Sequence, residues 1–217
     1  MELEMKYSIP DKATADAIWD DDYLAEIGDM STRKKTVMKA VYFDTPDRLL
    51  SGNNVAFRVR SEDGYMLATL KWGARVSDGF HSREEVNVPV AGDNCFIASP
   101  KEIFKESEDG LKLLELIGDR SLVNLLETRF LRSRMRISYG SSIMEMAIDT
   151  GSIVTDNGEL PIMELELELF AGDPADMKAL GKRLAERFNL TPGNESKLRR
   201  GLDLLDGKSI DEALETI

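Results

Sequence analysis

The sequence contains one cysteine, Cys95, and one histidine, His81, among 217 residues. A lone cysteine cannot close a disulfide within the chain, and a lone histidine excludes a histidine-rich metal centre. No run of about 18 uninterrupted apolar residues occurs, and the first residues are charged rather than a basic segment followed by an apolar one. We therefore expect a soluble, cytoplasmic protein without membrane contact, in which any metal has oxygen ligands.

Positive charge is also scarce. There are 28 lysine and arginine residues against 40 aspartate and glutamate residues, a formal net charge of -12. Nucleic acid and anionic lipid attract proteins with net positive fields, so this balance argues against nonspecific binding to either. Hydrophobic residues make up 42% of the chain, and we find no internal repeat or long flexible linker. These features predict one domain with a substantial core.

Much of the chain alternates charged and apolar residues, which is the period of a strand with two unlike faces. The predicted strands are 2–7, 36–43, 55–60, 65–72, 81–90, 129–139, 142–150 and 163–170. Helices are predicted at 11–26, within 91–128 including 122–126, and at 174–188, and a loop at 73–79. We expect an α+β fold in which the helices lie outside an antiparallel sheet.

Charged residues recur at every second position in these strands, so each set shares one face of its strand. The sets are Glu2, Glu4 and Lys6; Arg58 and Arg60; Arg83 and Glu85; Arg132, Arg134 and Arg136; Glu145 and Asp149; and Glu164, Glu166 and Glu168. They could be the solvent face of an ordinary sheet. Several sets carry one sign, however, and like charges side by side repel. A closed barrel with a charged lumen explains them better.

The two signs of charge suit different parts of one ligand. Clustered carboxylates at Glu2, Glu4, Glu164 and Glu166 could hold magnesium or manganese. The basic residues Arg58, Arg60, Lys71, Arg132 and Arg134 match phosphate oxygens in charge and shape. A chain of phosphates that bridges metal and arginines is the simplest ligand that uses both groups.

The motif Glu2-Leu3-Glu4-Met5-Lys6 resembles the Glu-x-Glu-x-Lys signature of the CYTH, or triphosphate tunnel, family. The order of later elements strengthens the resemblance over residues 1–203. These elements are Tyr42 to Pro46, Phe57 to Arg60, Thr69 to Lys71, Arg83 with Glu85, Arg132 with Arg134, Glu145 to Asp149, Glu164 to Glu166, and Ser196-Lys197. The sequence looks most like the bacterial inorganic triphosphatase branch across 79–88 and 161–169.

The resemblance implies a closed antiparallel β-barrel of about eight strands that forms a charged tunnel, with a domain over 1–205 and a short tail over 206–217. Carried onto matching positions, it implies metal ligands at Glu2, Glu4, Asp149, Glu164 and Glu166. It implies substrate contacts at Lys6, Arg58, Arg60, Lys71, Arg83, Arg132, Arg134 and Lys197. The candidate catalytic residues are Lys6, Glu85 and Arg58.

The implied activity is hydrolysis of inorganic triphosphate with magnesium or manganese. The same tunnel could instead take thiamine triphosphate or a nucleoside triphosphate, cyclise ATP, or bind polyphosphate or nucleotide without turnover, and the oligomeric state is left open. Other residues receive plain interpretations. We expect Glu168, Arg136 and His81 at the rim or in solvent, Cys95 as an apolar filler, and Trp19 and Trp72 in packing.

Overall fold

The computed structural model describes residues 1–90 and 100–207, so Cys95 and most of the predicted tail lie outside the described residues. The elements run in the order β1 (Glu2–Ser8), α1 (Lys12–Trp19), α2 (Asp22–Ile27), β2 (Gly28–Asp44), α3 (Leu49–Gly52), β3 (Ala56–Glu62), β4 (Tyr65–Ser77), β5 (Phe80–Val90), α4 (Pro100–Ile103), α5 (Glu108–Leu114), the 3₁₀ helix η2 (Glu115–Ile117), β6 (Val123–Tyr139), β7 (Ser142–Thr155), β8 (Gly158–Ala171), α6 (Pro174–Phe188), β9 (Thr191–Pro192) and α7 (Lys197–Leu205).

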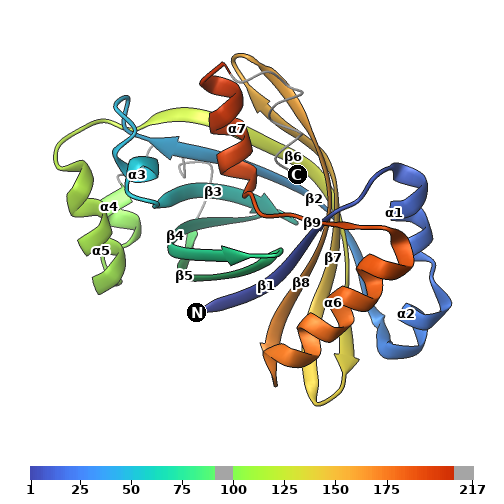
Figure 1. Ribbon diagram of the computed structural model, residues 1–217. Coiled ribbons are helices and arrows are strands. Elements are labelled where there is room, and N and C mark those ends of the chain that lie inside the picture. The colour runs from blue at the N-terminus through green and yellow to red at the C-terminus, as the bar shows by residue number, and fades with distance from the viewer. Residues whose placement is uncertain (91–99, 208–217) are drawn as a thin grey trace.

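Eight antiparallel strands close into a barrel. Their order is β5-β4-β3-β2-β6-β7-β8-β1, and β1 also pairs with β5, which joins the two ends of the sheet (Figure 1). The two-residue strand β9 is added to β1. Closure removes the exposed edges of the sheet and turns one of its faces into a lumen. The predicted barrel is therefore confirmed.

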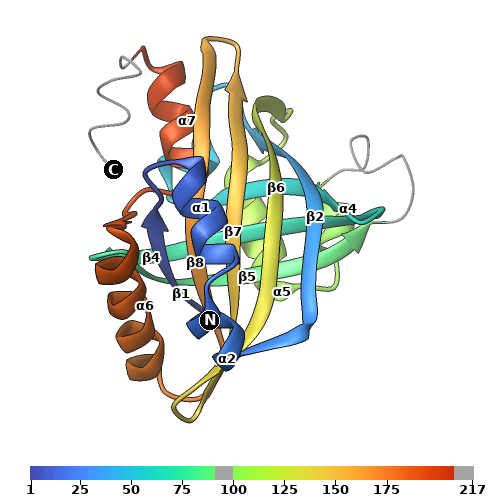
Figure 2. The same ribbon diagram turned by 90° about the vertical axis from the view of Figure 1, so that its right-hand side faces the viewer.

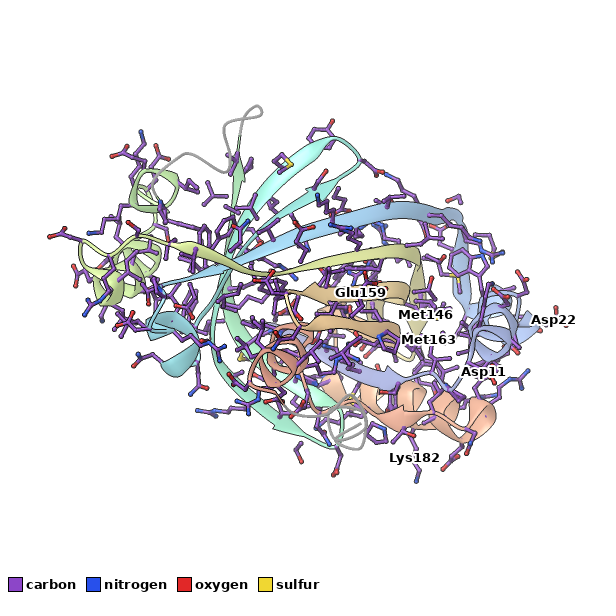
Figure 3. All side chains as sticks on the ribbon, turned by 90° about the horizontal axis from the view of Figure 1, so that it is seen from above. Asp11, Asp22, Met146, Glu159, Met163 and Lys182 are labelled. Carbon is purple, nitrogen blue, oxygen red and sulfur yellow. The ribbon has the colours of Figure 1, made fainter. Side chains whose placement is uncertain are left out.

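The outer face of the barrel carries the main apolar cores, which the helices cover. One core joins β1, β6, β7 and β8 to α1, α2 and α6, and a second joins β3 and β4 to α3, α5 and η2 (Figures 1 and 2). Seen from above, Asp11 and Asp22, at the starts of α1 and α2, lie on the same side of the barrel as Lys182 of α6 (Figure 3). The apolar residues of the alternating pattern thus face the helices, and the charged ones face the lumen.

Helix α7 covers one end of the barrel. Leu204 and Leu198 of this helix pack with a third apolar cluster, which includes Leu126 and Ile153 from β6 and β7. Contact is close, because a Cβ atom on Gly201 would lie only 2.4 Å from Leu126 Cδ2. The helix begins at Lys197, with the Ser196 hydroxyl accepting a hydrogen bond from Arg199 N, and this start places the Lys197 side chain at the lumen.

Three sequence predictions about elements are wrong in part. The predicted helix 11–26 is two helices, because Asp21 caps a new helix through Leu24 N at 3.1 Å. Residues 123–126, predicted as helical, open β6, since pairing with β2 overrides the local spacing of leucines. The predicted loop 73–79 is mostly strand, because β4 continues to Ser77 past a register shift between Trp72 and Arg75. Among the described residues, no helix is both long and apolar enough to cross a membrane.

Candidate functional site

The barrel encloses a cavity lined mostly by charged side chains, with a water-accessible volume of about 140 Å³. Eight basic and five acidic residues line it, an excess of three positive charges in a chain of net charge -12. The basic residues are Lys6, Lys39, Arg58, Arg60, Lys71, Arg83, Arg132 and Lys197, and the acidic residues are Glu2, Glu4, Glu85, Glu166 and Glu168. A small polyanion would find its counter-charges concentrated here.

The structure brings eleven of the fourteen predicted site residues to this lining. Arg134, Asp149 and Glu164 do not reach it. Asp149 and Glu164 contact lining residues from behind, as described below, whereas Arg134 pairs with Glu62 at 2.9 Å and with Glu145 at 3.6 Å. Arg134 thus already has two carboxylate partners.

The two glutamates that begin β1 are held by cations from the neighbouring strands. Arg83 Nε lies 2.5 Å from Glu2 Oε2, and its NH2 group lies 2.8 Å from Glu4 Oε1. Lys71 Nζ contacts Glu2 at 2.8 Å and Glu85 at 2.6 Å. Burial raises the pKa of both glutamates, but nearby cations outweigh it. Lys71 and Arg83 hold the pKa of Glu2 below its usual value, and Lys6 and Arg83 do the same for Glu4.

Lys6 is held by backbone hydrogen bonds to Gly79 and Gly193 and by side-chain ion pairs. Its Nζ lies 3.5 Å from both Glu4 and Glu166, and its carbonyl accepts a hydrogen bond from Gly193 N at 2.9 Å. A Cβ atom on Gly193 would lie 3.0 Å from Lys6 Cγ, so a larger residue here would require the Lys6 side chain to shift slightly. His81 Nε2 lies 2.7 Å from the Gly193 carbonyl, and His81 is 3% exposed. The expectation of a rim position for His81 is therefore wrong: it fastens the segment before α7 to β5.

Lys197 lies at the centre of three buried acids. Its Nζ is 2.9 Å from Asp149, 2.6 Å from Glu164 and 2.9 Å from Glu166. Oxygen atoms of these three carboxylates lie within 4.8 Å of one another, a spacing that could hold a metal ion. Here the ammonium neutralises them instead. A metal at this point would have to displace Lys197.

Two arginines complete the neutralisation of these acids. Arg132 makes two 2.7 Å hydrogen bonds to Asp149 and one of 2.5 Å to Glu166, and Arg200 donates to Glu164. Burial raises the pKa of Glu166, but Lys197 and Arg132 hold it well below its usual value. The same acids raise the pKa of Lys197 despite its burial. The lowered pKa of Glu166 and the raised pKa of Lys197 keep this pair ionised near neutral pH.

In the part of the chain that the structure describes, Arg58 has no carboxylate partner, and Arg60 has only a long contact with one. The Nε atoms of both are buried and, among the described residues, have no hydrogen-bond partner. Within residues 1–90 and 100–207, Arg58 donates only to the Tyr42 hydroxyl, at 3.3 Å, and Arg60 NH2 lies 3.8 Å from Glu62. Burial and the charge of Arg58 lower the pKa of Arg60. Two neighbouring guanidinium groups with unmet donors are a strong indication of an anion site.

Glu168 lines the cavity, although the sequence analysis placed it at the rim. It pairs across the strands with Glu4 and Glu145. Burial, together with the charges of Glu2, Glu4 and Glu145, raises the pKa of Glu168 to about 7. Crowded carboxylates of this kind are relieved by a bound dication.

We expect Glu168→Gln to remove a pH-dependent loss of stability. Because the pKa of Glu168 is about 7 in the folded chain and near 4.5 when unfolded, the folded state binds more protons between these values. Stability should fall as pH rises through this window in the wild type, and fall less in the variant. Melting temperatures from pH 4.5 to 8 in chelator measure this, with the exposed Glu186→Gln as control. Parallel curves for wild type and Glu168→Gln would contradict the shift.

Sequence reasoning missed further residues at the site, among them Arg200, Tyr42 and Lys39. Arg200 is 5% exposed and pairs with Glu164, and Tyr42 lines the cavity beside Arg58. Arg200 lies three positions after Lys197, which is the same face of a helix, so recognising a helix after Ser196 would have indicated it. The sequence analysis included Tyr42 only as the first residue of the Tyr42 to Pro46 segment and gave it no role.

Comparisons with known proteins agree with this geometry. Residues 1–202 match the family described as the CYTH domain. An inorganic triphosphatase of Haemophilus influenzae is 30% identical over 161 residues, which are 74% of this chain and 44% of that protein. This chain thus spans less than half the length of that relative.

Solved structures show the same fold at lower identity. A Hippeastrum protein, described as a putative adenylyl cyclase with a dominant triphosphatase activity, superposes with a TM-score of 0.69 at 19% identity, over 96% of this chain and 97% of its own. A putative adenylate cyclase from Bacillus halodurans gives 0.59 at 21% identity, over 92% and 96%. These likenesses establish the fold alone.

Proposed function

The chain belongs to the CYTH domain family, and from that premise we propose that it hydrolyses inorganic triphosphate to diphosphate and phosphate inside the barrel. The observation that carries the proposal is the pair of buried, unpartnered guanidinium Nε atoms of Arg58 and Arg60, in a cavity with three excess positive charges. The triphosphatase relative supports the choice of substrate.

The cavity also fits a divalent metal. Glu2, Glu4, Glu166 and Glu168 line it together, and carboxylate oxygens are the ligands that magnesium and manganese prefer. The raised pKa of Glu168, from burial and from Glu2 and Glu4, marks a surplus of negative charge there. We place the metal on these four residues rather than on Glu164, because Glu164 does not line the cavity. A bound metal would withdraw charge from the phosphoryl oxygens.

The remaining residues would bind and orient the phosphates. Arg58, Arg60, Lys71 and Arg132 surround the space from three strands and supply hydrogen-bond donors to phosphate oxygens. Phosphoryl transfer has a loose transition state, so neutralising charge and aligning water matter more than a strong base. Lys6 is an ammonium group and only donates, which suits it to orienting water or a terminal oxygen rather than to taking a proton.

Phosphate release tests the proposal. We expect release from inorganic triphosphate with magnesium or manganese, none with chelator, and a fall of about 10²-fold or more in kcat for Glu4→Gln, because a buried metal ligand is lost. Glu159→Gln, at the start of β8, serves as the control. A chain that triphosphate stabilises against heat without any phosphate release would instead be a binding protein.

A further inference from the structure

A pocket of about 380 Å³ lies on the outside of the barrel, between α6, β1 and the turn that joins β4 to β5. Helix α6 runs beside β1 on this side of the molecule (Figure 2). The volume falls within the roughly 300–1,000 Å³ of small-molecule sites. No residue that lines this pocket also lines the charged cavity, so the two spaces are separate.

Strand β1 is the wall between these two spaces. Met5 and Tyr7 line the outer pocket, whereas Glu4 and Lys6 line the charged cavity, because alternate residues of a strand point to opposite faces. The turn between β4 and β5 is fastened to the same strand, since Lys6 N donates to the Gly79 carbonyl at 2.7 Å. A ligand in the outer pocket would therefore contact the strand that carries Lys6, from its other side.

Tyr7 gives this pocket a hydrogen-bond donor that is not used. The residue is 3% exposed, and its hydroxyl makes no hydrogen bond within residues 1–90 and 100–207. A Cβ atom on Gly181 would lie 2.6 Å from this hydroxyl, so the glycine leaves room for it against α6. Burial raises the pKa of Tyr7 to about 12, so the hydroxyl keeps its proton at neutral pH. Buried donors are normally satisfied, so this one indicates an acceptor on a ligand.

The charged residues of the lining are Lys178, Lys182 and Asp78, an excess of one positive charge. The Lys178 ammonium lies 4.2 Å from the centre of the Phe80 ring and, in the described part of the chain, has no carboxylate within ion-pair distance. Lys182 Nζ lies 3.8 Å from Glu186. Lys178 is thus the cation available to a ligand, and a ligand with one negative charge would balance the lining.

The rest of the wall is largely apolar and includes Met5, Phe80, Ala185 and Pro192. We propose that this outer pocket binds a small apolar molecule that carries a single carboxylate, such as a medium-chain fatty acid. The carboxylate would accept a hydrogen bond from the Tyr7 hydroxyl and lie near Lys178, while the apolar part would rest against the Phe80 ring. A phosphate ester, with two negative charges, would leave one of them unmatched.

Calorimetric titrations with hexanoate, octanoate and phenylacetate, beside the primary amide of each, test this proposal. We expect at least one carboxylate to bind the wild type, and its uncharged amide to bind roughly tenfold more weakly, as for the loss of one charge-assisted hydrogen bond. Tyr7→Phe should weaken binding of that carboxylate by a similar factor, roughly tenfold, and should not lower the melting temperature, because no hydrogen bond within the protein is lost. Tyr65→Phe, at a 79% exposed position outside the pocket, is the matched control.

Two further variants identify where the carboxylate binds. Lys178→Met changes an exposed side chain and should weaken binding about two- to fivefold, the range of a solvent-exposed ion pair. Arg58→Met should leave binding unchanged, because Arg58 lines only the charged cavity. Loss of binding in Arg58→Met with none in Tyr7→Phe would place the carboxylate in the charged cavity and overturn the proposal. No binding of any carboxylate to the wild type, or equal binding of carboxylate and amide, would also overturn it. Because these titrations measure no phosphate release, their outcome is independent of the proposed function.

Discussion

Lys197→Met should destabilise the folded chain by about 3–5 kcal/mol at neutral pH, the usual cost of removing one partner from a buried ion cluster. In the wild type, Lys197 Nζ lies within 2.9 Å of oxygens from Asp149, Glu164 and Glu166. Without the ammonium, these buried carboxylates would repel one another with only arginines and Lys6 left to oppose them. Urea unfolding at pH 7 measures the loss.

The sign of its pH dependence gives a sharper test. In the wild type the pKa values of Glu164 and Glu166 are lowered overall despite burial, so their stabilisation is present above the unfolded pKa near 4.5 and is lost as pH falls through the lower folded values. In the variant both values should rise. The difference in stability between wild type and variant should therefore be large at pH 8 and shrink toward pH 4.5.

Two further variants serve as comparisons for Lys197→Met. Adding Glu166→Gln to Lys197→Met should recover part of the stability, because it removes one of the buried carboxylates that repel one another. Arg132 keeps its two hydrogen bonds to Asp149 in this double variant. Lys182→Met removes an exposed lysine of α6 whose Nζ lies 3.8 Å from Glu186, and should cost less than about 1 kcal/mol (Figure 3). A pH-independent loss in Lys197→Met would point to lost packing instead of charge.

Arg58→Met should strongly lower activity and should change the stability of the folded chain little. We expect kcat/KM for inorganic triphosphate to fall about 10²–10³-fold, because a donor aimed at the phosphoryl oxygens is lost. The unliganded variant should melt at the same temperature as the wild type or higher. Arg58 has no carboxylate within ion-pair distance among the described residues, and its buried Nε has no partner.

Thermal melts with and without triphosphate, beside phosphate-release kinetics, test this expectation. Triphosphate should raise the melting temperature of the wild type more than that of Arg58→Met, since only binding to the folded state stabilises it. Arg129→Met removes an arginine whose side chain is 57% exposed and pairs with Glu127, and it should match the wild type in both assays. A marked drop in the melting temperature of unliganded Arg58→Met would show that Arg58 serves the fold.

Local sequence determined much of this architecture. A strand places alternate residues on opposite faces, so the alternation itself assigned Arg58, Arg60 and Arg132 to one environment and their apolar neighbours to another. The start of α6 followed from Asp173, which caps Ala175 N at 2.8 Å, and from Pro174 at the first helical position. These signals depend on neighbours within a few residues, so they can be read without the fold.

Tertiary structure decided which charged residues share the site and which neutralise one another. Glu164, Glu166 and Glu168 occupy every second position of β8, so the sequence places all three on the same face of the strand. Only the register against β1 and the position of α7 distinguish them. Glu164 is held by Lys197 and Arg200, about 35 positions along the chain, while Glu168 joins the cavity. Electrostatic energy depends on distances in space between buried groups, and these are set by packing rather than by sequence spacing.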